Sequence, residues 1–427
     1  MATKTTPVLL LTGYLGSGKT TLLNKILNNK KGIKFAVIVN DIGEVNIDAD
    51  LIAKGGVVGG GDDSLVALQN GCICCTLKTD LMQQLSDLVQ QKFDYIVIEA
   101  SGICEPEPIA QTICSMPTIA PNLTRHGVPV LDCIVTVVDA LRLKSEFEAG
   151  DKLTAKEIGE EDLESLVIQQ IEFCNVILLN KISEVSKEDA AHIKSIIRAL
   201  QPKAEIFECD YCDIDFDKIL NTHLFNFEKT VTAATWVQEI EKPLDEDEHE
   251  HHHDEDHHHH HHDHDHDHDD DEHEHHHHDD DDDEHEHHHG HGHHHHHHHE
   301  GEGEAEEYGI GTFVYFRRRP FDINKFDWFV AKHWPKSVIR AKGICYFSEN
   351  TDMSYLFEQA GVQKKLTEAG QWYATAPEDE LERMLATEPG LRRDWDDEYG
   401  DRMQKLVFIG QHLDREAITA ALDACLD

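Results

Sequence analysis

The stretch GYLGSGKT, from Gly13 to Thr20, follows an apolar run that begins at Pro7 and opens a helical pattern that reaches Leu27. This spacing fits GxxxxGK[ST] in the strand-to-helix context that the motif requires. The glycines let backbone N–H groups close around anionic oxygens, and the helix N-terminus adds partial positive charge. We therefore expect Lys19 to neutralise the β- and γ-phosphates of a nucleotide, and the Thr20 hydroxyl to ligate Mg²⁺.

Further short apolar runs follow along the first half of the chain. They begin at Lys34, Asp94, Cys133, Asn175 and Ala204, and amphipathic helical patterns such as 79–91 and 189–200 separate some of them. Runs that are apolar on both faces are typical of buried parallel strands. The alternation predicts an α/β domain with a doubly wound, mostly parallel sheet over residues 1–235.

A low-complexity tract interrupts the chain. Between Leu244 and Glu307 it holds 28 acidic residues, 30 of the 35 histidines and no Lys or Arg. Such a segment cannot bury enough apolar area to offset its ordering entropy. We expect residues 236–307 to be a disordered linker and residues 308–427 to form a second domain.

The segment after the tract mixes strand and helix patterns. Apolar runs that begin at Gly311, Val338 and Lys405 predict strands, and 324–332, 378–385 and 414–426 predict helices. This mixture favours a small α+β domain.

Charge and cysteine content limit the classes of function. The formal net charge of −45 repels phosphate backbones and anionic membranes, so we expect no nucleic-acid and no membrane partner. No run of about 18 apolar residues is present to span a bilayer. The eleven cysteines are clustered only once, which favours a reduced, cytoplasmic protein with a metal site over a secreted disulfide framework.

Two other elements fall where a nucleotide hydrolase needs them. Glu99 ends a predicted strand, where a carboxylate can hold the Mg²⁺ shell, and Gly102 lets the next loop approach the γ-phosphate. Asn180 and Lys181 end a later strand, at the place of a base-recognition loop. GTPases carry an Asp two residues further on, but this chain has Ser183, a weaker and less selective partner for guanine.

The cysteine cluster reads GCICCT, with Cys72, Cys74 and Cys75 just before a helical pattern. Thiolate is the metal-binding form of cysteine, and a helix N-terminus lowers the thiol pKa. Three thiolates within four residues suit Zn²⁺, Cu⁺ or another thiophilic ion, with a carboxylate or water as the fourth ligand. Glu44 is the candidate carboxylate.

The histidine tract has the composition of a flexible chelator. Much of its imidazole is unprotonated near neutral pH, and the interspersed carboxylates favour divalent cations. Individual sites are weak, but high valency raises local capture. The alternative interpretation is an acidic linker that keeps the protein in solution.

Taken in order, GYLGSGKT, NDIGEVNID, NGCICCTLKTDL, YIVIEASGICEPEPI and LLNK give the chain a resemblance to the CobW-like metallochaperone GTPases, most like the zinc-responsive bacterial members. The resemblance covers about residues 5–230 and resumes in the C-terminal segment. It implies that Cys72, Cys74 and Cys75 bind the cargo metal. It also implies a GTP site made of Gly13, Tyr14, Leu15, Gly16, Ser17, Gly18, Lys19, Thr20, Thr21, Asn180 and Lys181.

The spacing of these motifs suggests how the two sites communicate. Thr76 and Lys78 lie at the start of the helix that follows the cysteines, within reach of a γ-phosphate, and 41–48 resembles a first switch region. Metal held by the three thiolates and Glu44 would then be released to a client zinc metalloenzyme when GTP hydrolysis relaxes both segments. Asp48 is the candidate that activates the attacking water.

Other interpretations of the same residues stay open. Ser183 leaves room for a P-loop kinase or ATPase, and the His tract with the cysteine cluster also suits a zinc buffer that nucleotide modulates. A cobalt- or nickel-inserting GTPase is a third alternative. The sequence leaves the oligomeric state open, a homodimer included.

Overall fold

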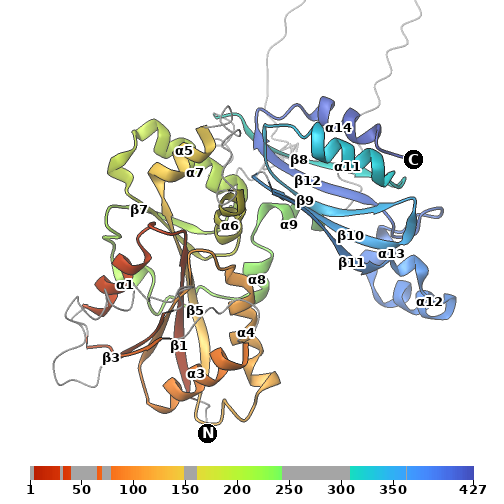
Figure 1. Ribbon diagram of the computed structural model, residues 1–427. Coiled ribbons are helices and arrows are strands. Elements are labelled where there is room, and N and C mark those ends of the chain that lie inside the picture. The colour runs from red at the N-terminus through yellow and green to blue at the C-terminus, as the bar shows by residue number, and fades with distance from the viewer. Residues whose placement is uncertain are drawn as a thin grey trace, which may run out of the picture. The chain divides into compact units, whose positions relative to one another are not determined.

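The computed structural model describes residues 4–28, 32–39, 65–69, 78–148, 161–242, 308–361 and 363–427. These residues form two sheets with their helices (Figure 1). The His-rich tract, the cysteine cluster 72–75, Glu44, Asp48 and Thr76 lie outside the described residues.

The N-terminal sheet is parallel, with the strand order β3-β2-β4-β1-β5-β6-β7. Its strands are β1 (Thr5–Gly13), β2 (Phe35–Val39), β3 (Leu65–Gln69), β4 (Tyr95–Glu99), β5 (Val128–Asp139), β6 (Val176–Asn180) and β7 (Glu205–Cys209). The predicted doubly wound α/β fold is confirmed. Strand β3 was not predicted from the sequence; it follows a glycine-rich segment that has no strand pattern.

The helices of this domain lie on both faces of the sheet. They are α1 (Lys19–Leu27), α3 (Lys78–Gln90), α4 (Pro106–Ile119), α5 (Ala140–Glu148), α6 (Glu161–Glu172), α7 (Lys187–Leu200) and α8 (Phe227–Val231), with 3₁₀ turns η3 (Ile182–Glu184) and η4 (Phe216–Lys218). Helix α9 (Thr235–Glu241) follows and contacts the C-terminal segment, where Lys405 Nζ donates to the Ile240 carbonyl at 2.8 Å. Helix α9 occupies residues predicted as the start of the linker. No described helix is long and apolar enough to cross a membrane.

Successive residues of β1 point to opposite faces and are buried on both. Val8 and Leu10 belong to a core shared with α3, α4, α6 and α7, whereas Leu9 and Leu11 pack with α1 on the other face (Figure 1). This two-sided burial explains why the run is apolar without alternation.

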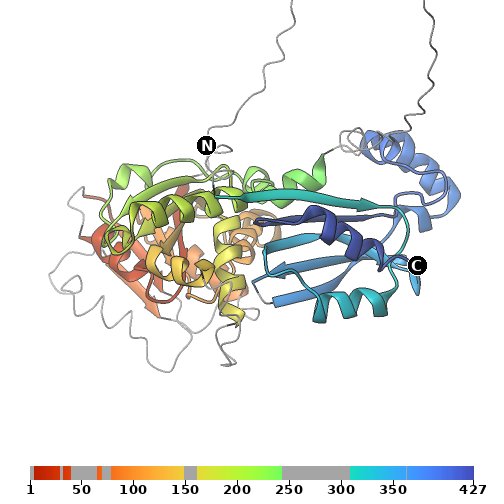
Figure 2. The ribbon, with the colours of Figure 1, turned by 90° about the horizontal axis from the view of Figure 1, so that it is seen from above.

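The C-terminal sheet is antiparallel, with the order β11-β10-β9-β12-β8. Its elements are β8 (Ile310–Arg317), α11 (Ile323–Lys332), β9 (Val338–Phe347), β10 (Asn350–Ala360), β11 (Gln363–Gln371), η7 (Tyr373–Thr375), α12 (Glu378–Thr387), α13 (Pro389–Arg393), β12 (Gln404–Gln411) and α14 (Arg415–Asp423). Helices α11 and α14 share one aromatic-rich core with this sheet (Figure 2). The predicted α+β class is confirmed.

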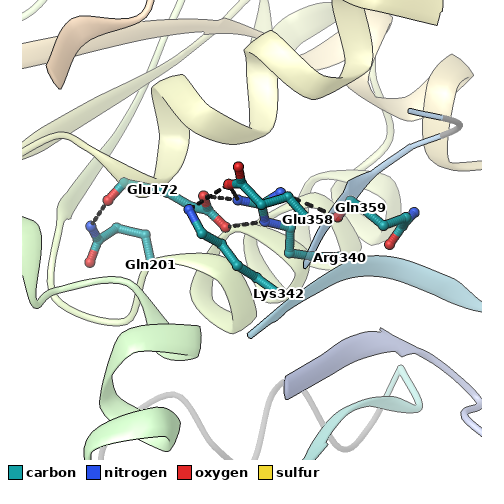
Figure 3. Close-up of polar contacts among 6 residues, drawn as sticks. All are labelled: Glu172, Gln201, Arg340, Lys342, Glu358 and Gln359. Carbon is teal, nitrogen blue, oxygen red and sulfur yellow. Dashed lines mark hydrogen bonds and ion pairs between the residues drawn. The ribbon is translucent and has the colours of Figure 1, made fainter. Parts of the chain in front are cut away.

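A buried ion pair joins the two sheets' domains. Arg340 of β9 donates from Nε to Glu172 Oε1 at 2.8 Å and from Nη2 to Oε2 at 3.0 Å, and Glu172 is the last residue of α6 (Figure 3). The side chains are 2 % and 8 % exposed. The Gln359 carbonyl accepts a further bond from Nη1 at 3.2 Å, so the guanidinium is held on two sides.

Candidate nucleotide and metal site

The phosphate loop connects β1 to α1 through three glycines with positive φ. Gly13 has φ 133°, Gly16 has φ 77° and Gly18 has φ 116°, values that side chains rarely adopt. Lys19 begins α1, is only 7 % exposed, and donates from Nζ to the Tyr14 carbonyl at 3.1 Å. The lysine is thus folded back over the loop, as expected for a side chain that meets a bound phosphate. Leu15 and Thr21 are exposed beside it.

Two side chains at this loop have the donor chemistry for a hydrated magnesium ion. Thr20 donates from Oγ1 to Glu99 Oε1 at 2.9 Å, and Glu99 is 2 % exposed at the end of β4. Hydroxyl and carboxylate oxygens are the ligand types that Mg²⁺ takes beside substrate phosphates. The fully buried Ser17 Oγ makes no hydrogen bond to a described residue, which leaves a polar atom for a ligand in the loop. The residues present therefore fit a Mg²⁺–nucleotide group.

Gly102, in the loop after β4, lies directly against the phosphate loop. A Cβ at Gly102 would come within 2.7 Å of the Leu15 backbone nitrogen, closer than real contacts allow. On its other side, Gln170 Nε2 donates to the Gly102 carbonyl at 3.3 Å and to the Cys104 carbonyl at 3.2 Å. The loop is therefore fixed between the phosphate loop and α6.

Replacing Gly102 by Ala should weaken GTP binding about tenfold. The added methyl must displace Leu15, and overpacking of this kind costs roughly 1–3 kcal/mol, part of which falls on the bound state. Titration with a fluorescent GTP analogue measures the change. Gly390→Ala is the matched control, because nothing lies within 4 Å of a Cβ there. Equal affinities for the two variants would contradict the close approach of the loops.

Asn180 contacts the phosphate loop at Ser17 and Gly18. Its side chain is 2 % exposed and donates from Nδ2 to the Ser17 carbonyl at 2.8 Å. Its Oδ1 accepts from the Cys212 backbone N–H at 2.9 Å. A Cβ at Gly18 would come within 2.5 Å of Nδ2, so Gly18 is required at this contact.

The residues after Asn180 contact the end of β5 and the loop that follows β7, and the sequence predicted neither contact. Lys181, with φ 60°, forms an ion pair with Asp139 at the end of β5. Ser183 donates to Asp210 Oδ1 from its backbone nitrogen at 3.1 Å and from Oγ at 2.9 Å.

Cys209 is the last residue of β7, and Cys212 lies in the loop that follows it. The Cys212 thiol donates to the Gly18 carbonyl at 3.5 Å, and the Cys209 thiol donates to Asn180 Oδ1 at 3.7 Å. Through Asn180 and Gly18, the two cysteines contact the phosphate loop, and no sequence signal indicated these contacts.

The predicted zinc ligands Cys72, Cys74, Cys75 and Glu44 lie outside the described residues, and so do Asp48 and Thr76. Lys78 is described: it is the first residue of α3 and is exposed. Within the part of the chain that the structure describes, no three His, Cys, Asp or Glu side chains form a metal-binding group.

The described residues that flank these segments end at one edge of the sheet. In the parallel register Gln69 pairs with Val39, Val39 with Glu99, and Glu99 with Leu11. The chain therefore leaves β2 toward Glu44, and β3 toward the cysteines, from the same edge at which β1 leads into the phosphate loop.

Comparison with known families decides the identity of this fold. Residues 7–208 match the model described as "CobW/HypB/UreG, nucleotide-binding domain", and residues 310–426 match "Cobalamin synthesis protein cobW C-terminal domain". A relative from Dictyostelium discoideum, "Zinc-regulated GTPase metalloprotein activator 1", is 32% identical over 437 aligned positions, which cover 98% of this chain and 79% of that protein. The chain belongs to the CobW family of P-loop GTPases. It is accordingly a GTP hydrolase.

Other CobW-family relatives share the N-terminal part. The "Zinc chaperone YjiA" of Escherichia coli (strain K12) is 32% identical over 232 positions, which cover 53% of this chain and 64% of that protein. Among solved structures, the "Zn(II)-bound YjiA GTPase from E. coli" is 21% identical with a TM-score of 0.38, over 99% of this chain and 100% of that chain.

Proposed function

We propose that this CobW-family GTPase is a metallochaperone that binds Zn²⁺ through Cys72, Cys74, Cys75 and Glu44 and transfers it to a client metalloenzyme when GTP is hydrolysed. The observation that carries the proposal is that β1, β2, β3 and β4 all end at the same edge of the parallel sheet. The segments that hold the four ligands leave β2 and β3 beside the carboxyl ends of β4 and β1, where Glu99 and the phosphate loop lie. Relatives named for zinc chaperone and zinc-regulated activator functions support the choice of metal.

The chain's own residues would bind and orient the nucleotide in this scheme. The backbone of the phosphate loop would hold the phosphates, while Lys19 exchanges its contact with the Tyr14 carbonyl for the phosphate charge. Thr20 and Glu99 would hold Mg²⁺, which neutralises the charge that develops on the phosphate oxygens when bound. Asn180 would keep the loop in this shape, and Asp48 stays the candidate that orients the attacking water.

Coupling between the two sites would follow from their shared elements. Lys78 begins α3 only three residues after Cys75, so Thr76 and Lys78 connect the thiolates to the helix N-terminus. Contacts from these residues to the γ-phosphate would order the segment with GTP and be lost with GDP. By linkage, metal must raise GTP affinity by the same factor by which GTP raises metal affinity.

We expect Zn²⁺ to bind about 5- to 150-fold more tightly with a non-hydrolysable GTP analogue than with GDP, the range usual for coupled sites. The measurement is competition with a chromogenic chelator on a variant that lacks residues 245–307, because the 30 tract histidines would otherwise mask the site. Replacing Cys72, Cys74 and Cys75 by Ser should abolish the nucleotide-dependent binding. Equal Zn²⁺ affinity in the two nucleotide states would eliminate hydrolysis-gated release.

A zinc buffer modulated by nucleotide is the second candidate, favoured by the composition of the tract. The same deletion separates the two functions. A chaperone keeps its metal-stimulated GTPase activity through the cysteine cluster, whereas a buffer loses most of its metal capacity with the tract. Parallel titrations with Co²⁺ and Ni²⁺ test the alternative cargo ions.

A further inference from the structure

Guanine selectivity needs an acceptor that Ser183 alone does not provide. The guanine edge presents two adjacent donors, the N1–H and the exocyclic amino group. A carboxylate can accept from both, and such charge-assisted bonds are roughly twice as strong as neutral ones. Ser183 offers one hydroxyl at the position where GTPases carry this carboxylate.

The carboxylate of Asp210 lies against Ser183. Asp210 directly follows β7, and β7 pairs in parallel with β6 so that Cys209 is opposite Asn180. The Asp210 side chain is therefore brought to the loop after Asn180, where Oδ1 accepts from the Ser183 Oγ at 2.9 Å and from its backbone nitrogen at 3.1 Å.

The second carboxylate oxygen of Asp210 is available for a ligand. Oδ2 makes no hydrogen bond to a described residue, and within the described part of the chain Asp210 forms no ion pair, whereas Asp139 and Asp213 pair with Lys181 and Lys25. Asp210 is partly exposed, so a ligand can reach it.

The loop that carries Asp210 is fixed to the phosphate loop. The Asp213 N–H donates to the Asp210 carbonyl at 3.0 Å and closes a turn, and within that turn the Cys212 N–H bonds Asn180 at 2.9 Å. Asn180 in turn bonds the Ser17 carbonyl at 2.8 Å. Two buried hydrogen bonds through Asn180 thereby fix this loop relative to the phosphate loop.

We propose that Asp210 is the guanine-specificity residue, and that Ser183 holds it in place by two hydrogen bonds. The carboxylate that GTPases carry in the loop after β6 is then supplied from the loop after β7, which compensates for Ser183. The inference rests on the nucleotide site proposed above.

Asp210→Asn should change the preferred base from guanine to xanthine. Xanthine carries a carbonyl where guanine has its amino group, and an amide N–H donates to that carbonyl while a carboxylate repels it. We expect GTP affinity to fall and XTP affinity to rise by roughly 100-fold each, since a hydrogen bond to a charged group contributes about tenfold or more. Competition of GTP, XTP and ATP against a fluorescent GTP analogue measures both changes in the full-length protein.

Two further variants make the test specific. Asp213→Asn is the matched control, because Asp213 is three residues away with an 86% exposed side chain, and it should keep the wild-type preference. The exchange Ser183→Asp with Asp210→Ser should restore guanine preference, whereas Ser183→Asp alone places two carboxylates in contact and should weaken GTP binding.

An unchanged preference in Asp210→Asn, or an equal loss of GTP, XTP and ATP, would overturn the assignment. Lys19→Ala separates this failure from failure of the nucleotide site, because it should weaken all three nucleotides whatever their base. If Lys19→Ala binds GTP normally, the site itself is wrong. If only Asp210→Asn behaves as wild type, the site stands and the base is recognised elsewhere.

Discussion

Lys19→Ala should lower the rate of GTP hydrolysis by about 100- to 1,000-fold, the usual effect of removing one preorganised donor from a site where charge develops. Lys19 is 7 % exposed at the start of α1 and contacts the Tyr14 carbonyl at 3.1 Å, so the structure already holds its charge over the loop. Phosphate release under saturating GTP and Mg²⁺ measures the loss.

Lys25→Ala is the matched control for Lys19→Ala. Lys25 belongs to the same helix, but its side chain is 34% exposed and pairs with Asp213 at 3.1 Å. Its removal should leave turnover within a factor of about two, because exposed ion pairs contribute little. Metal binding by the His-rich tract should survive in both variants. Undiminished turnover in Lys19→Ala would show that the GxxxxGK[ST] motif is not the site of hydrolysis.

The elements that the sequence predicted are those whose local pattern matches their burial. Strand β1 is apolar at every position because both its faces are covered, and α1 follows a motif that needs a helix there. Strands β10 and β11 were missed for the opposite reason. Nearly all of β11 is exposed, so its polar sequence carries no strand signal. The strand forms through its pairing with β10.

The contacts of the site also fall into two groups: those that a sequence motif indicates and those that arise only from the pairing of strands. The sequence assigned both Thr20 and Glu99 to Mg²⁺, and their contact is possible because β1, which leads into α1, pairs in parallel with β4, which ends at Glu99. The contact between Ser183 and Asp210 joins residues 27 positions apart through the pairing of β6 with β7, which no local pattern reveals. The role of Cys212 was missed likewise, because it acts through its backbone N–H. The zinc ligands lie outside the described residues and stay predictions.

Arg340→Ala should lower the free energy of unfolding by about 3–5 kcal/mol, as expected when one partner of a buried ion pair is removed. The remaining Glu172 carboxylate would keep its burial, at 8 % exposure, without the two guanidinium bonds of 2.8 and 3.0 Å (Figure 3). Lys342 does not replace Arg340 in the observed contacts, since it pairs with Glu358 at 2.6 Å. Urea denaturation followed by circular dichroism measures the loss.

The double variant Glu172→Met with Arg340→Met distinguishes the charge from the packing. Replacing both partners by apolar side chains removes the stranded charge, so the double variant should be more stable than Arg340→Ala by several kcal/mol. Arg393→Ala is the control, because the pair Arg393–Asp394 is 43% and 26% exposed and should cost less than about 1 kcal/mol. If Arg340→Ala costs no more than this control, Glu172 is hydrated in solution. The ion pair then does not hold α6 to β9. This matters for the nucleotide site because α6 also carries Gln170, which donates to the Gly102 carbonyl beside the phosphate loop.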